Sequence, residues 1–175
     1  MITAALALLC LAADDAKPAT DLERLAASRA AWEQARDAAG GNYAYEVLQI
    51  TLVSRQKTRV VVRGGKVVER AFERETNVPQ AVEPGLPAAA RPFSWTETGA
   101  ELGTHGDGAA APETVDALYD KAARLLAAPK AEFRERSLGI EERGFLHHCF
   151  ERDSRIADDA PLAGVPPFQI TLGKP

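Results

Sequence analysis

The sequence is poor in cysteine, has no long apolar run and carries no excess of positive charge. Its formal net charge is -4 and its isoelectric point is about 5.5. A general nucleic-acid-binding protein needs a concentrated basic surface, so we expect no nucleic-acid partner. The apolar stretch at residues 1–13 is shorter than the roughly 20 residues that span a bilayer. We therefore expect no transmembrane span.

Several sequence motifs of enzymes are also missing. The chain contains no G-x-S-x-G nucleophile elbow, no P-loop, no G-x-G-x-x-G turn and no H-E-x-x-H pair. We therefore predict no catalytic residue and no cofactor, and we favour a non-catalytic protein over an enzyme.

The N-terminal residues have the pattern of a removed signal peptide. Residues 1–13 are apolar and end in small residues just before Asp14, which predicts cleavage near Ala13 and a periplasmic or secreted protein. A buried N-terminal helix is the alternative, because no Lys or Arg follows Met1. The residues before Cys10 do not fit the small-residue position of a lipidation site, so a lipid anchor is disfavoured. Without this leader only Cys149 remains, and no internal disulfide is possible.

After a linker at residues 14–19, residues 20–175 are predicted to form one α+β domain. Thr20 and Glu23 form a capping box, which starts a helix over 21–38 with Leu22, Leu25 and Trp32 facing inward. A second helix begins near Pro112. Its apolar stripe comprises Val115, Leu118, Tyr119, Ala122, Leu125 and Leu126.

The remaining segments show the alternation of strands. The clearest is the hairpin over 57–74, whose turn Gly64-Gly65 tolerates the positive φ of a primed turn. Further strands are predicted over 43–52, 132–138, 144–151 and 168–172. We expect an antiparallel sheet of about five to six strands with two helices on one face, in the order α-β-β-β-α-β-β-β. A long loop over 75–111 interrupts this order, and Trp95 is expected to clamp it onto the sheet.

The motifs described above resemble a family of small bacterial exported proteins that carry a domain of unknown function. The resemblance rests on Arg29-Ala-Ala-Trp32, Tyr43-Ala-Tyr45, Arg59 to Val68, Thr114 to Tyr119, and the ending from Cys149 to Leu172 with its Asp158-Asp159 loop. It covers most of the chain from Arg29 onward. It implies export and this fold, and it supplies no catalytic residues. Relatives often carry a Cys pair after the Tyr-x-Tyr segment, and this chain has none there.

The hairpin is predicted to carry a basic face. A two-residue turn without irregularity pairs Arg63 with Lys66, Val61 with Val68, Arg59 with Arg70, Lys57 with Phe72 and Arg55 with Arg74. One face then holds Arg55, Lys57, Arg59, Arg63, Lys66, Arg70 and Arg74, and the other holds Val60, Val62, Val67, Thr58 and Ala71. The basic face is either solvated and balanced by acids such as Glu46, Glu132 and Glu135, or it docks an anionic ligand or envelope component.

A second hypothesis is an enzyme or metal-binding protein that uses His105, His147 and Cys149. His and Cys are preferred zinc and copper ligands. Because neighbouring strand residues point to opposite faces, His147 and Cys149 could share a site while His148 could not. Two ligands are too few, and a third from His105, Asp158 or Asp159 would match no standard metal motif.

Overall fold

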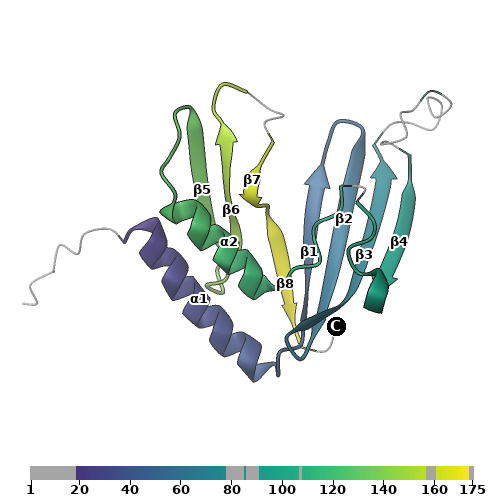
Figure 1. The fold of residues 1–175 in the computed structure, drawn as a ribbon, viewed down its shortest axis with the longest axis horizontal. Helices are drawn as coiled ribbons and strands as arrows, with labels where there is room; N and C mark the ends of the chain where they lie inside the picture. Colours follow the sequence, from purple (N-terminus) through teal and green to yellow (C-terminus); the bar gives the residue numbers. More distant parts are fainter. Residues whose placement is uncertain (1–18, 78–84, 86–90, 107, 157–160, 174–175) are drawn as a thin grey trace, which may run out of the picture.

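The computed structural model describes residues 19–77, 85, 91–106, 108–156 and 161–173, and it shows an α+β fold (Figure 1). The elements are α1 (Asp21–Ala38), β1 (Tyr43–Ile50), β2 (Ser54–Arg63), β3 (Lys66–Thr76), β4 (Phe93–Thr98), the 3-10 helix η3 (Gly99–Glu101), α2 (Val115–Ala127), β5 (Arg134–Ile140), β6 (Leu146–Asp153), β7 (Ala163–Val165) and β8 (Phe168–Leu172). The predicted fold class is confirmed. The strands form two antiparallel sheets rather than one, in the orders β4-β3-β2-β1-β8 and β5-β6-β7.

Helix α1 has the predicted bounds, and Thr20 caps it. The Thr20 side chain accepts a hydrogen bond from the Glu23 backbone, and the Glu23 side chain accepts one from the Thr20 backbone. Leu25 and Trp32 are buried as predicted. Leu22 is 46% exposed, so its predicted inward position is wrong. The first turn of α1 lies at the edge of the molecule, and its residues 21–24 are all exposed (Figure 1).

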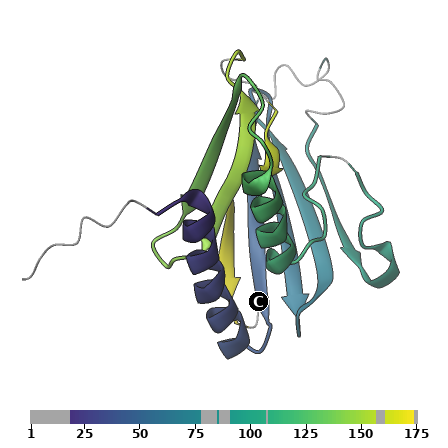
Figure 2. The same ribbon diagram turned by 60° about the vertical axis from the view of Figure 1, so that its left-hand side comes forward.

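The core lies between the two helices and the sheets. Both helices lie on the same side of the strands (Figures 1 and 2). Tyr119 of α2 ties three elements together, since its hydroxyl contacts Ser28 Oγ at 2.8 Å and accepts a hydrogen bond from the Leu146 backbone at 2.8 Å. The fully buried side chains of the cluster include Trp32, Tyr43, Tyr45, Val60, Val62, Val115, Tyr119, Leu146, Cys149 and Val165.

The two sheets are joined by one broken strand. Strand β7 pairs with β6, and two residues later β8 pairs with β1. The residues between them are Pro166 and Pro167. Proline has no backbone N–H and cannot continue a hydrogen-bonded ladder, so the chain changes partners at this point. Strand β1 pairs with β8 only from Tyr43 to Val47, and its last three residues have no partner strand on that side.

The five-stranded sheet has two different ends, which we name by their packing. At the closed end β1 and β3 begin and β8 finishes. Three backbone segments meet there: Gly65 N donates to Gly41 O at 3.0 Å, and Gly173 N donates to Asn42 O at 3.1 Å. At the open end β1 finishes, and the two sheets diverge beyond the start of β8 (Figure 1).

The outer strand β4 is held by a buried ion pair near the closed end. Glu97 is fully buried and receives Arg70 Nε at 2.8 Å and Arg70 Nη2 at 2.9 Å. The backbone N–H groups of Gly103 and His105 also donate to Glu97, at 2.8 and 2.6 Å. These hydrogen bonds, chiefly from Arg70, hold the pKa of the Glu97 carboxyl far below its usual range. The segment after η3 is thereby fixed to β4.

Trp95 contributes to the same attachment, as predicted. Its ring stacks on His105 with a centroid distance of 4.6 Å and on Phe72 at 5.4 Å. The predicted loop over 75–111 therefore contains a strand, a 3-10 helix and this clamp.

The predicted leader, Cys10 and the Asp158-Asp159 pair lie outside the described residues. In the part of the chain that is described, no helix is long and apolar enough to cross a membrane.

Candidate functional site

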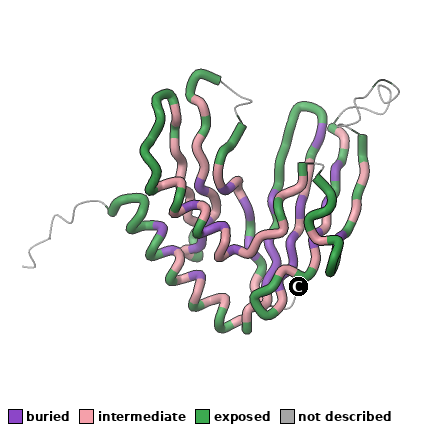
Figure 3. Tube along the Cα trace, viewed as in Figure 1, coloured by how far each residue is buried: buried purple, intermediate pink, exposed green. Residues whose placement is uncertain are grey.

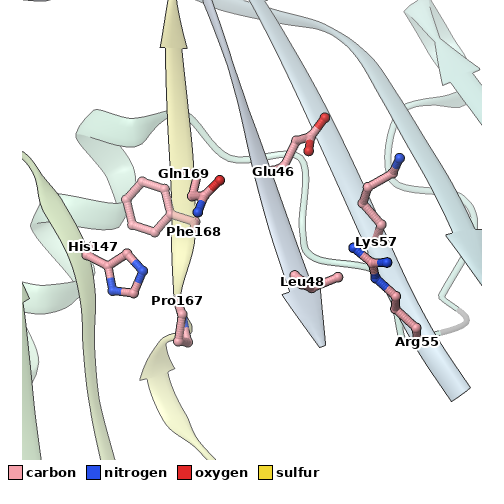
Figure 4. Close-up of a pocket in the computed structure, with 8 residues that line it drawn as sticks. All are labelled: Glu46, Leu48, Arg55, Lys57, His147, Pro167, Phe168 and Gln169. Atoms are coloured by element: carbon pink, nitrogen blue, oxygen red, sulfur yellow. The ribbon is translucent and has the colours of Figure 1, made fainter. Parts of the chain in front are cut away.

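A pocket of about 270 Å³ lies where the two sheets meet, near the open end (Figure 4). We call it the intersheet pocket. Strands β1, β2 and β6 and the start of β8 supply its walls. The lining residues are Glu46, Leu48, Arg55, Lys57, His147, Pro167, Phe168 and Gln169. The proline break creates this space, because β8 begins opposite Val47 and no described strand pairs with the remaining residues of β1 on that side.

One wall of the pocket carries two cations from β2. Lys57 Nζ lies 2.8 Å from Glu73 Oε2, so its charge is balanced locally. On β1, Glu46 lies 3.8 Å from Arg59 in a loose pair. Arg55 is exposed and forms no salt bridge with another described residue. Glu75 lies opposite Arg55 on β3 but forms no salt bridge with it, so Arg55 is the one cation of the pocket without a salt bridge to a described residue.

The opposite wall carries His147, whose ring lies beside Phe168 and Pro167 (Figure 4). A β-bulge places it there: Gly139 is opposite His148, while Ile140 is opposite Leu146, so His147 has no partner.

Because of this bulge, the predicted alternation of His147 and His148 between opposite faces is wrong. His147 Nδ1 and His148 Nδ1 are 2.8 Å apart, so the two rings lie together rather than on opposite faces. Cys149 is buried against α2, with its thiol 3.9 Å from Ala122 O. Burial raises the pKa of the Cys149 thiol to about 11.

The imidazole of His148 is held in a fitted position. Its Nε2 lies 2.9 Å from Ser137 Oγ, and its ring lies over Gly139, where an added Cβ would be 2.2 Å from the ring. Burial, followed by the charge of His147, lowers the pKa of His148. His148 is therefore neutral at pH 7, and the Nδ1 to Nδ1 contact needs one ring to donate and the other to accept.

The predicted pairing of the β2–β3 hairpin is wrong beyond the turn. The turn itself is confirmed, with Arg63 opposite Lys66 and positive φ at both glycines. A β-bulge at Val68 then shifts the register by one residue. Val61 faces Glu69, Arg59 faces Ala71, Lys57 faces Glu73 and Arg55 faces Glu75. Because a one-residue shift exchanges the two faces of a strand, every side chain of β3 beyond the bulge lies on the face opposite to the predicted one.

The seven candidate anion-binding residues consequently occupy three places. Arg55, Lys57 and Arg59 lie on the outer face of the sheet, and Arg63 and Lys66 flank the turn at the closed end. Arg70 and Arg74 are buried on the inner face with Phe72. Arg70 pairs with Glu97, and the Arg74 guanidinium lies 3.8 Å from the Phe93 ring centroid. Only Arg55 and Lys57 reach the intersheet pocket.

The structure does not bring His105, His147 and Cys149 together. His105 bonds to Glu97 at 2.9 Å, beside β4, while Cys149 lies under α2. Among the described residues, no group of three or more His, Cys, Asp or Glu side chains is arranged to hold a metal ion.

The intersheet pocket therefore combines a guanidinium without a salt bridge to any described residue, an imidazole and the apolar side chains of Leu48 and Pro167. A guanidinium binds carboxylate or phosphate groups through paired N–H donors, and the apolar wall suits a short hydrocarbon. No protein-family model, no curated protein and no solved structure matches this chain. The site is accordingly interpreted from its own geometry, and the resemblance to an exported family stays a prediction.

Proposed function

We propose that this protein is an exported, non-catalytic binding module that takes a small amphipathic anion in the intersheet pocket. The observation that carries the proposal is Arg55, a cation without a salt bridge to any described residue, which lines the same pocket as the apolar side chains of Leu48 and Pro167. A ligand with a carboxylate or phosphate head and a short apolar body satisfies both walls. Ligand sites commonly combine a mostly apolar lining with a few polar groups that set orientation.

Isothermal titration calorimetry with octanoate, octanol and octylamine tests the proposal. We expect octanoate to bind more tightly than the neutral alcohol or the amine, because only the carboxylate can pair with Arg55. Arg55→Gln should weaken octanoate binding by about tenfold or more, the effect of losing a hydrogen bond to a charged group.

Lys66→Gln is the matched control, because it removes one exposed cation at the hairpin turn, outside the pocket. It should leave the affinity for octanoate unchanged. Equal affinities for octanoate and octanol, or equal losses in the two variants, would reject the proposed recognition of an anion by Arg55.

Export is the other half of the proposal and has its own test. The predicted signal peptide would be removed between Ala13 and Asp14. N-terminal sequencing of the protein isolated from the envelope or the medium should then begin at Asp14. A chain that begins at Met1 and remains in the cytosol would contradict export without bearing on the pocket.

A further inference from the structure

Exposed apolar side chains of the described chain are concentrated at the open end. Nine large apolar residues of the described chain are exposed, and the two most exposed, Leu52 at 88% and Ile50 at 69%, lie in the β1–β2 turn and at the end of β1 directly before it. Six of the nine lie in or next to three turns: Ile50, Leu52, Val53, Phe133, Ile156 and Leu162. Scattered exposed apolar residues are normal, but such a concentration marks an interaction surface.

The strand pairing places these three turns at the same end of the molecule. Strand β6 is antiparallel to β7, and β8 is antiparallel to β1. Since β7 and β8 follow one another across the proline break, β6 and β1 run in the same direction and finish at the same end. Arg134 pairs with Asp153, so the turn before β5 lies there too. Figures 1 and 3 show the described parts of these turns at the same end of the molecule, where most of their residues are exposed.

The β1–β2 turn is held in shape by its own polar groups. Thr51 Oγ1 accepts hydrogen bonds from the backbone N–H groups of Val53 at 3.3 Å and Ser54 at 3.0 Å. Asn77 donates from its side chain to Thr51 O at 2.9 Å and from its backbone to Val53 O at 2.9 Å. These internal bonds reduce the free energy required to remove the turn from water, because unpaired backbone groups are costly outside water.

Phe133 has an unusual backbone conformation and an exposed side chain. It is the one non-glycine residue of the described chain with a positive φ, 60°, and it is 49% exposed. Ser154 fixes this conformation by donating from its backbone N–H to Phe133 O at 2.8 Å. The Arg155 guanidinium lies 4.9 Å from the ring centroid. An aromatic ring beside a guanidinium suits the boundary between head groups and acyl chains, where amphipathic side chains collect.

We infer that the open end docks on a lipid bilayer, with the exposed apolar side chains of the β1–β2 turn and those of Phe133, Ile156 and Leu162 entering the boundary between head groups and acyl chains. A bilayer offers a continuous apolar layer, so side chains from separate segments can enter it together. Arg55 lies at the start of β2, next to the β1–β2 turn, and its guanidinium can pair with anionic head groups. Arg55 is shared with the pocket, but none of the exposed apolar side chains that enter the bilayer lines it, so the docking holds whether or not the pocket binds octanoate.

Sedimentation with vesicles of phosphatidylethanolamine and phosphatidylglycerol tests the inference. The chain from Asp14 onward is used, because the leader is itself apolar and the buried core residues that the structure describes lie between Leu25 and Ile170. We expect the protein to bind, and Ile50→Ser with Leu52→Ser to weaken binding by about tenfold or more, as two apolar side chains leave the membrane.

The matched control is Leu22→Ser with Val68→Ser, which removes two exposed apolar side chains outside the open end. It should bind vesicles as the unaltered chain does. Circular dichroism should show all variants folded, since each substitution is exposed. Failure of the unaltered chain to bind vesicles, or equal weakening in both double variants, would overturn docking through the open end.

Discussion

The closed and open ends of the five-stranded sheet are built from the same strands yet differ in chemistry. At the closed end, glycines and Asn42 tie three segments together by backbone hydrogen bonds, and Glu97 is buried with Arg70. At the open end the proline break separates the sheets, a pocket opens and apolar side chains face water. The comparison indicates that the closed end supports the fold and the open end is available for binding. Substitutions at the two ends should therefore separate stability from binding.

The largest effect on stability is expected from Glu97→Gln. Removing the charge leaves the Arg70 guanidinium buried without its counter-ion, a change that typically costs about 3 kcal/mol or more in the free energy of unfolding. Urea unfolding at neutral pH measures the difference. A loss below about 1 kcal/mol would show that the ion pair does not anchor β4.

The same substitution should change the pH dependence of stability. The folded-state pKa of Glu97 lies below the ordinary carboxyl value of 4.5, so its stabilisation is fully present above that pH and is lost as the pH falls. The difference in unfolding free energy between the unaltered chain and Glu97→Gln should shrink on going from pH 7 to about pH 3. A difference that is constant with pH would contradict this assignment.

Gly41→Ala should have the next largest effect, about 2 kcal/mol of destabilisation. Gly41 has a φ of 70°, and an added Cβ would lie 2.9 Å from the backbone N of Gly65. The alanine is therefore destabilising for two reasons: its backbone is held at a positive φ, and its Cβ clashes with the Gly65 backbone. Thermal unfolding measures the change, with Gly64→Ala as the control for strain alone, since its Cβ would meet nothing within 4 Å. Equal destabilisation by the two variants would show that the close contact between residue 41 and Gly65 does not contribute to the effect.

The smallest effects on stability are expected at the open end. Arg55→Gln and Leu52→Ser alter exposed side chains, and each should change the free energy of unfolding by less than about 0.5 kcal/mol. Urea unfolding of both variants checks this expectation. A larger loss would mean that the open end also supports the fold, and binding measurements on these variants would then need correction for unfolding.

The elements that could be predicted from the sequence depend on local signals. The capping box at Thr20 and the apolar stripe of α2 act within a few residues, and both helices form where those signals lie. The Gly64-Gly65 turn is likewise a local requirement for positive φ. Two strands escaped prediction: β4 lies among prolines, and β7 is only three residues long.

The two bulges could not be predicted in the same way, because one extra residue shifts the phase without changing the composition. The hairpin did contain a clue. The regular register leaves Phe72 on the outer face and sets Arg59 opposite Arg70, whereas the shifted register buries Phe72 and sets Lys57 opposite Glu73. Burial of an aromatic ring and pairing of opposite charges both favour the bulge.

The intersheet pocket was beyond prediction for a different reason. Its walls come from β1, β2, β6 and β8, and they meet only because the chain changes partner strands at Pro166 and Pro167. The sequence showed those prolines as part of a loop. The exchange of partners depends on how the two sheets pack, which no local pattern records.

The most direct test of the proposed function is a titration of the isotope-labelled protein with octanoate, followed by ¹⁵N–¹H correlation spectra. We expect shifts that saturate at the backbone amides of Arg55, His147 and Gln169, which come from three strands and line one pocket. The amides of Gly64, Lys66 and Gly103 at the closed end should not move. Shifts confined to the closed end, or no saturable shifts at all, would contradict binding in the intersheet pocket.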